Sequence, residues 1–213
     1  MHFKLFRIIL IIAVNSLFIS SAFSETPAHE LDQLLQSVHT YHAHFSQSVQ
    51  DNHGRSISKA RGAFYLMRPG KFRWEVTEPD AELIIATGNQ LLIYDKELQQ
   101  LTIKHLKSNL GETPALLLTQ NDMTSEQHFN VKLESSPKSG EWFLLTPKDH
   151  GSFFAEMHLD FENHILKVMK LRDSLDQITT VQFNQIEVNS PIAESLFHLK
   201  VPPHTDVIHE AAK

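Results

Sequence analysis

The chain has 213 residues, enough for one domain with a sizeable core, and a formal net charge of −6 from 19 basic and 25 acidic side chains. An acidic chain without a cluster of lysines and arginines is not expected to bind nucleic acid. The sequence contains no cysteine, so no disulfide supports the fold and no cysteine is available for acylation behind a leader.

The first 24 residues have the pattern of a secretion signal. Two basic residues precede a short apolar run, Ile8 to Ile19, which falls short of the roughly 20 residues that a transmembrane helix needs. Ala22-Phe23-Ser24 provides small side chains at the positions that signal peptidase reads. We expect residues 1–24 to be a signal peptide and 25–213 to form one soluble, exported domain; a retained N-terminal anchor is the alternative.

A short amphipathic helix is expected next, with Thr26 as its cap and Pro27 at its first position. Its apolar stripe consists of Leu31, Leu34, Leu35, Val38 and Tyr41. Beside it, His39, His42 and His44 are close enough to hold a metal ion, although no carboxylate or cysteine completes an obvious set. A polar helix end is the other interpretation, and the sequence leaves the question open.

From Phe45 onward the apolar period changes to two, which predicts an antiparallel meander of about six strands as far as Ile103. The most informative stretch is Arg68 to Glu78. Pro69-Gly70 favours a turn, and Phe72, Trp74 and Val76 then alternate with charged residues. We expect a strand with an aromatic face and a solvated face, with Arg68 just before the turn.

A short helical segment interrupts the strands. Thr113-Pro114 repeats the signal of a cap followed by proline, and Ala115 to Leu118 are all apolar. This segment is more apolar than a surface connection usually is. A plain core helix is the alternative to a functional one.

Strands resume at Phe129 and continue to the C-terminus, where Phe197, Leu199 and Val201 alternate before Pro202-Pro203. The chain shows no internal repeat and no linker. We therefore expect a mainly β protein with a few helices, built as one strongly curved antiparallel sheet or unclosed barrel of about 11 strands.

Signals of catalysis are few. The sequence has no nucleophile elbow and no phosphate-binding glycine loop. His150 has Asp149 and Ser152 beside it, the residue types of a triad, but neighbours in one loop rarely form one. We expect neither an enzyme nor a bound cofactor or metal.

The strands carry large apolar side chains in surplus, and several are expected to point inward from a curved sheet. If sheet and helices enclose a space, these residues line a cavity; if they do not, the residues fill a core. The sequence does not separate the two. The inward candidates are Phe64, Phe72, Trp74, Tyr94, Trp142, Met157 and Phe161.

The sequence resembles the LolA family of outer-membrane lipoprotein carriers along essentially the whole exported part. The most specific match is Arg68-Pro69-Gly70-Lys71-Phe72-Arg73-Trp74-Glu75. The chain departs from the family pattern at Leu92, where tryptophan is frequent, and at His204-Thr205, where a glycine often precedes the last segment. Supporting matches are Phe45-Ser46-Gln47, Gly62, Phe64, Tyr94-Asp95, Gln100-Leu101-Thr102, Thr113-Pro114-Ala115, Leu145-Thr146-Pro147-Lys148 and Asp206-Val207.

The resemblance implies a monomeric periplasmic chaperone with a helical lid over an apolar cavity for acyl chains, which Leu92, Leu116 and Leu118 would also line. It implies acylated lipoproteins as cargo, a LolCDE-like transporter of the inner membrane as donor, and a LolB-like receptor of the outer membrane as acceptor. Arg68 would latch the lid by binding backbone carbonyls near Leu116 to Leu118; an exposed arginine at a turn is the alternative. Because Phe72 follows the turn and shares a face with Trp74 and Val76, we expect it near the cavity entrance. A binding or sensor domain for small lipids or other apolar ligands is the alternative function.

Overall fold

The computed structural model describes residues 25–105, 125–135, 140–149, 152 and 154–210. The expected signal peptide, the expected helical segment with Leu116 and Leu118, and His150 lie outside these residues. Within them, no helix is both long and apolar enough to cross a membrane. The helices are α1 (Pro27–Gln36), α2 (Ser125–His128) and the 3₁₀ helix η3 (Glu194–Phe197); the strands are β1 (Thr40–Gln50), β2 (Ser56–Met67), β3 (Lys71–Glu78), β4 (Glu82–Thr87), β5 (Gln90–Asp95), β6 (Gln100–His105), β7 (Phe129–Ser135), β8 (Glu141–Pro147), β9 (Phe154–Glu162), β10 (Ile165–Asp173), β11 (Ile178–Val188) and β12 (Asp206–His209).

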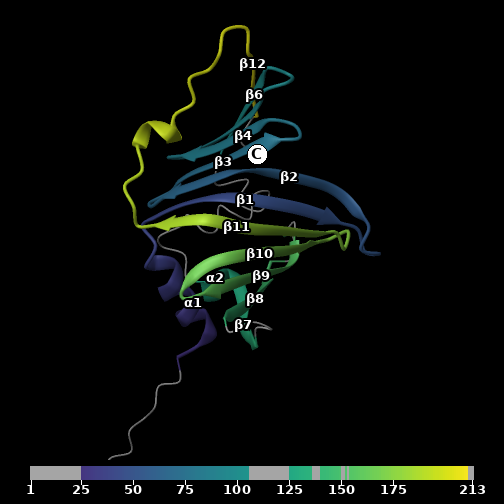
Figure 1. Ribbon diagram of the computed structural model, residues 1–213, viewed down its shortest axis with the longest axis vertical. Helices are drawn as coiled ribbons and strands as arrows, with labels where there is room; N and C mark the ends of the chain where they lie inside the picture. The colour runs from purple at the N-terminus through teal and green to yellow at the C-terminus, as the bar shows by residue number, and fades with distance from the viewer. Residues whose placement is uncertain (1–24, 106–124, 136–139, 150–151, 153, 211–213) are drawn as a thin grey trace, which may run out of the picture.

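The strands form a single unclosed sheet in the order β12-β6-β5-β4-β3-β2-β1-β11-β10-β9-β8-β7. Figure 1 shows this order from β12 and β6 at the top to β7 at the bottom, with α1 and α2 at the lower left. The expected mainly β, unclosed architecture is confirmed, with 12 strands in the described part of the chain instead of about 11. The additional strand is β12, which runs parallel to β6.

Two meanders make up this sheet. Strands β1 to β6 pair with their neighbours in sequence, and so do β7 to β11. The two meanders are joined by the antiparallel pair of β1 and β11, in which Tyr41 faces Val188 and Gln50 faces Ile178. The longest strands of the sheet therefore lie at its centre.

Helix α1 covers one face of the sheet, which we call the inner face. Thr26 Oγ1 accepts a hydrogen bond from the His29 amide at 3.3 Å, and Pro27 occupies the first turn, so the expected cap is confirmed. Leu31 and Leu34 pack into a large apolar cluster formed by alternate residues of the strands. That cluster also contains Tyr41, Ala43, Phe45, Phe64, Leu66, Phe72, Trp74, Ala86, Leu91, Phe129, Phe143, Leu145, Phe154, Met157, Leu159, Phe161, Leu166, Met169, Val181 and Phe183.

A buried polar contact ties α1 to α2. The carboxylate Oδ1 of Asp32 accepts hydrogen bonds from the Ser125 amide at 2.9 Å and the Ser125 hydroxyl at 2.5 Å. Asp32 and Ser125 are both buried, and the two bonds satisfy the buried carboxylate oxygen and the first amide of α2.

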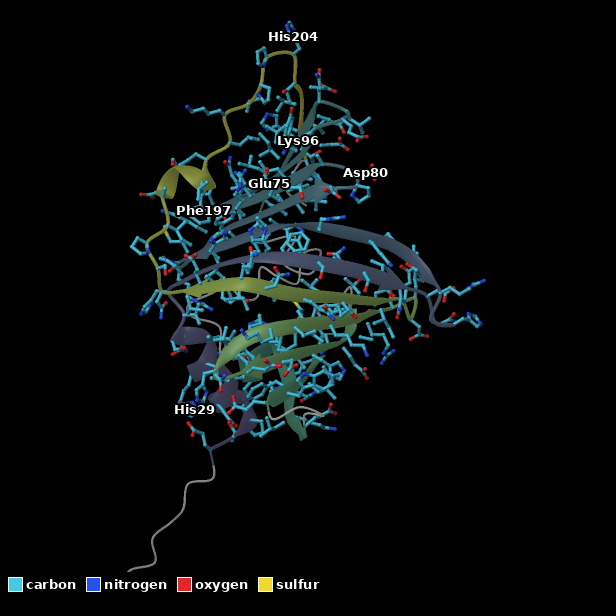
Figure 2. All side chains as sticks on the ribbon, viewed as in Figure 1. His29, Glu75, Asp80, Lys96, Phe197 and His204 are labelled. Atoms are coloured by element: carbon cyan, nitrogen blue, oxygen red, sulfur yellow. The ribbon has the colours of Figure 1, made fainter. Side chains whose placement is uncertain are left out.

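The opposite, outer face of β4 to β6 is also apolar, and the C-terminal segment covers it. Leu83, Ile85, Tyr94 and Leu101 form a second cluster, against which Leu92, Ile103 and Leu199 pack. The segment after β11, residues 189–210, is here called the C-terminal arm. In Figure 2, Phe197 is labelled near η3 and His204 at the top of the arm, where the chain turns back toward β12. Where the sequence alternation predicts a strand from residue 197 to 201, the arm forms η3 and an extended stretch instead.

Candidate functional site

The candidate site is built around β3, whose two faces have different tasks. Phe72 and Trp74 lie on the inner face, where Phe72 is fully buried and Trp74 is 8% exposed. Arg73 and Glu75 lie on the outer face and form an ion pair at 2.8 Å. The alternation of this strand is therefore as the sequence predicts.

Aromatic rings gather around Trp74 on the inner face. Phe45 stacks on Trp74 with a centroid distance of 3.9 Å, and Phe64 lies 5.6 Å from it. Phe64 is also 5.9 Å from Phe72 and 5.7 Å from Tyr41. These separations are those of rings in direct contact, so the aromatic residues form one continuous apolar wall.

The stacking of Phe45 on Trp74 depends on Gly62, which lies on β2 between their strands. A Cβ atom at Gly62 would stand 1.8 Å from the carbonyl oxygen of Glu75 and 2.9 Å from the Phe45 ring. Only glycine allows this close approach of β2 to β3.

A small apolar cavity lies between α1 and this wall. Its volume is about 30 Å³, room for only one or two water molecules. A space of this size is too small for an acyl chain, and Leu34 and Leu35 of α1 form one of its walls. The described residues that line it are Leu34, Leu35, Val38, Tyr41, Phe64, Leu66, Arg68, Phe161, Ile165, Leu166 and Val188.

Arg68 is the charged residue in the wall of this cavity. Its Nε donates a hydrogen bond to the Val38 carbonyl at 2.9 Å, and its own amide donates to the His39 carbonyl at 2.9 Å. Burial lowers the pKa of its guanidinium from the usual value, although arginine remains charged. Arg68 thus binds the segment that follows α1; the carbonyls near Leu116 to Leu118 that we expect it to bind lie outside the described residues.

The other expected cavity residues divide between the two faces of the sheet. Met157 and Phe161 lie in the inner cluster with Phe64, Phe72 and Trp74. Leu92 and Tyr94 instead belong to the outer cluster beneath the C-terminal arm.

Trp142 also lies away from the inner cluster. It faces Asp160 in the pairing of β8 with β9 and lies 5.6 Å from the His158 ring. Its neighbour Phe143 occupies the inner face and contacts Phe161 edge to face at 5.8 Å. The structure therefore places five of the expected residues in the inner cluster, of which Phe64 and Phe161 line the cavity, and it places three elsewhere.

Several residues of the inner wall were not expected there from the sequence. Tyr41 was expected on the apolar stripe of the first helix, but α1 ends at Gln36 and Tyr41 lies on β1. Tyr41, Phe45 and Phe183 contribute rings to the inner wall, and the Tyr41 hydroxyl donates a hydrogen bond to the Leu166 carbonyl at 2.7 Å. Burial raises the pKa of the Tyr41 hydroxyl above its usual value, so this group stays protonated at any physiological pH. The alternation of β1 carries the signal for the first two, since Tyr41, Ala43 and Phe45 share one face.

The histidine-rich segment does not form a metal site with its described neighbours. His42 stacks on Tyr65 at 4.3 Å with nearly parallel planes, and His44 lies 6.1 Å from His42. Within the described part of the chain, no group of three or more histidine, aspartate or glutamate side chains is arranged to hold a metal ion.

Comparison with known proteins gives a consistent result. The family model of the outer membrane lipoprotein carrier protein LolA matches residues 36–200. The outer-membrane lipoprotein carrier protein of Hahella chejuensis is 38% identical over 182 residues, which is 85% of this chain and 87% of that protein. The carrier protein of Legionella pneumophila is 36% identical over 207 residues, 97% of this chain and 99% of that protein.

One solved structure supports the fold independently. The crystal structure of a conserved protein from Thermus thermophilus, described as uncharacterized, superposes with a TM-score of 0.57 over 87% of this chain and 100% of that chain. The sequence identity is 14%, so this similarity concerns the fold alone.

Proposed function

The chain belongs to the outer membrane lipoprotein carrier protein LolA family, and from this premise we propose that it shields the acyl chains of lipoproteins between two membranes. Its cargo is acylated lipoprotein, and its role is that of a chaperone rather than an enzyme. Mature residues 25–213 act as one domain in the periplasm, after removal of a signal peptide at 1–24.

The observation that carries this proposal is the apolar wall beneath α1. The wall is continuous, it is made of rings and aliphatic chains, and the cavity between it and α1 is small. A permanently open cavity of this kind would expose apolar surface to water when it is empty. A cavity that α1 closes when empty and uncovers for cargo avoids that cost.

The free energy needed to extract a lipoprotein from a membrane indicates which partners the carrier requires. Burying one methylene group contributes about 0.8 kcal/mol, so three long acyl chains anchor a lipoprotein in a membrane by on the order of 30 kcal/mol. The sequence has no phosphate-binding loop with which to supply this work. We infer that an ATP-driven transporter of the inner membrane extracts the cargo and that a receptor of the outer membrane accepts it.

Closure of the cavity must be weak enough to reverse. Arg68 is suited to this, because a hydrogen bond from a charged donor to a carbonyl contributes about 1.5–3 kcal/mol, which biases an equilibrium without locking it. In this proposal Arg68 latches α1 through Val38 and also binds the segment near Leu116 to Leu118. Part of the free energy of cargo binding is used to open the latch. The net affinity for cargo is therefore lower, and later release is easier.

The test uses the purified exported protein and an apolar fluorescent probe. We expect a synthetic triacylated lipopeptide to displace the probe, and the same peptide without acyl chains to leave it bound. Protein isolated from its own periplasm should also carry triacylated lipoproteins detectable by mass spectrometry. Displacement by free fatty acid but not by the lipopeptide would contradict the carrier function and indicate a domain for small lipids.

A further inference from the structure

The connection between α1 and β1, residues 37–40, is held from two sides. On one side, Arg68, which directly follows β2, binds the carbonyls of Val38 and His39 at 2.9 Å each. Helix α1 can leave the sheet only by rotation about this connection, because β1 is paired on both of its edges. The groups that hold residues 37–40 therefore set the position of α1.

On the other side, the connection is held by Asn189, the first residue of the C-terminal arm. Asn189 Oδ1 accepts hydrogen bonds from the amides of His39 at 2.7 Å and Thr40 at 3.4 Å. Asn189 Nδ2 donates to the Ser37 carbonyl at 3.0 Å, and the Asn189 amide donates to the Thr40 carbonyl at 2.8 Å. One side chain thus bridges the last turn of α1 and the first residues of β1.

The backbone of Asn189 is shaped for this task. Its φ is 58°, in the left-handed region that asparagine adopts more readily than most residues. The next residue continues the contact, since the Ser190 carbonyl accepts a hydrogen bond from the Thr40 hydroxyl at 2.7 Å. Asn189 is exposed, so these bonds can open and close without disturbance of the core.

Beyond Asn189, the C-terminal arm is fastened to the outer face of β3. Arg73 Nη1 donates to the Leu196 carbonyl at 3.0 Å, Lys71 forms an ion pair with Glu194, and Phe197 is fully buried. Figure 1 shows α1, the end of β11 and the start of the arm meeting at the left edge of the sheet, with the arm continuing past β3. The C-terminal arm therefore links the connection after α1 to β3, the strand whose inner face carries Phe72 and Trp74.

We propose that Asn189 is a positioning residue that, together with Arg68, sets the closed position of α1 and transmits its displacement to the C-terminal arm. The proposal rests on the carrier function, in which α1 moves to admit acyl chains. When α1 opens, the amide bridge of Asn189 is strained or broken, and η3 loosens on the outer face. Binding of cargo in the cavity then changes the conformation of η3 on the opposite face of the sheet.

Three variants test whether the side-chain amide of Asn189, rather than its backbone conformation, holds the connection. Asn189→Gly removes the side chain but tolerates the positive φ, and Asn189→Asp keeps the acceptor for the His39 amide while losing the donor to Ser37. Asn163→Gly is the matched control, because Asn163 is also exposed, with a φ of 51°, in the β9–β10 turn. In Asn189→Gly we expect about fivefold faster hydrogen exchange at the His39 amide, measured by NMR. Asn189→Asp should retain the protection of that amide, and the control should match the wild type.

The binding readout uses the triacylated lipopeptide. A closed state weakened about fivefold raises the open fraction, so Asn189→Gly should bind the lipopeptide up to about fivefold more tightly and release it more slowly. A variant that is merely less stable would not bind more tightly. In the wild type, lipopeptide should also accelerate exchange in residues 194–197, and Asn189→Gly should reduce this response.

The outcomes distinguish the inference from the function on which it rests. If the wild type binds the lipopeptide and Asn189→Gly equals it in affinity and in exchange, Asn189 does not position α1 and the inference is wrong. If the wild type binds no lipopeptide, the carrier function fails. In that case unchanged exchange at His39 in Asn189→Gly would independently overturn the role of Asn189 at the connection.

Discussion

Replacement of Phe72 by glutamate tests whether Phe72 is packed as a core residue or lies at an open entrance to the cavity. From the sequence, Phe72 is expected at a cavity entrance, where Phe72→Glu would disturb lipid handling more than folding. Phe72 is completely buried in the structure. Its ring lies against that of Phe64, and its strand is paired with β2 on one edge and with β4 on the other. The complete burial supports the opposite expectation, a large loss of stability.

The expected loss of folding stability in Phe72→Glu has two contributions. Loss of a buried phenylalanine costs about 3–5 kcal/mol, and an unpaired buried carboxylate adds several kcal/mol more. Together they approach the whole stability of a typical domain, about 5–15 kcal/mol. At neutral pH we therefore expect Phe72→Glu to be largely unfolded, as measured by circular dichroism during thermal unfolding.

The pH dependence gives the reasoning a second check. Burial raises the pKa of the introduced carboxyl above its unfolded value of about 4.3, so the neutral form is favoured in the folded state. The penalty is small below the unfolded pKa and increases as the pH rises through the folded pKa. The stability difference between Phe72→Glu and the wild type should therefore shrink as the pH falls.

Phe72→Leu is the control, because it keeps an apolar side chain and should cost only about 1–2 kcal/mol. A core position for Phe72 would be excluded if Phe72→Glu melted within about 3 °C of the wild type at neutral pH but no longer bound the lipopeptide, since a loss of several kcal/mol lowers the melting temperature much further. Phe72 would then line an open cavity, as the sequence suggests.

Three further changes test other parts of the site. Arg68→Leu should lower the free energy of lid closure by about 1.5–3 kcal/mol. It should load lipopeptide normally and deliver it to the purified receptor more slowly. The control Arg61→Leu, which removes an exposed ion pair, should behave as the wild type in the same transfer assay. Gly62→Ala should cost about 3 kcal/mol or more, because its Cβ would collide with backbone; a melting temperature equal to that of the wild type would contradict the close approach of β2 and β3. Tyr41→Phe should lose about 1–2 kcal/mol in urea unfolding through its missing hydroxyl bond, and unchanged stability would show that the buried bond contributes nothing net.

Much of the fold could be predicted because period-two alternation is clear where one face of a strand is solvated. The inner and outer faces of β3 are an example, since charged residues separate Phe72, Trp74 and Val76. The cap of α1 could be predicted for a similar reason, because threonine followed by proline acts through local contacts alone.

The cavity lining could be predicted only in part. Leu92 and Tyr94 lie in strands that are apolar on both faces, because the C-terminal arm covers the second face. Alternation then gives no direction, and the covering segment is about a hundred residues away in the chain. Trp142 is ambiguous in the same way, with Phe143 beside it on the other face.

The C-terminal arm itself was hard to predict. Strand β12 has four residues, all of them exposed, and its pairing with β6 depends on backbone groups that leave no pattern in the side chains. The contacts of Asn189 are equally hidden, since its partners at residues 37–40 are adjacent only after β1 and β11 have paired.

That central pairing has a consequence for the order of folding. Each meander can assemble from strands that are neighbours in sequence while the chain is still being made. The seam between β1 and β11 joins Tyr41 to Val188, so it cannot form until nearly the whole chain is available. Contacts between such distant residues form slowly. Because the seam also fixes the start of β1, α1 has no defined position on the sheet until that final step.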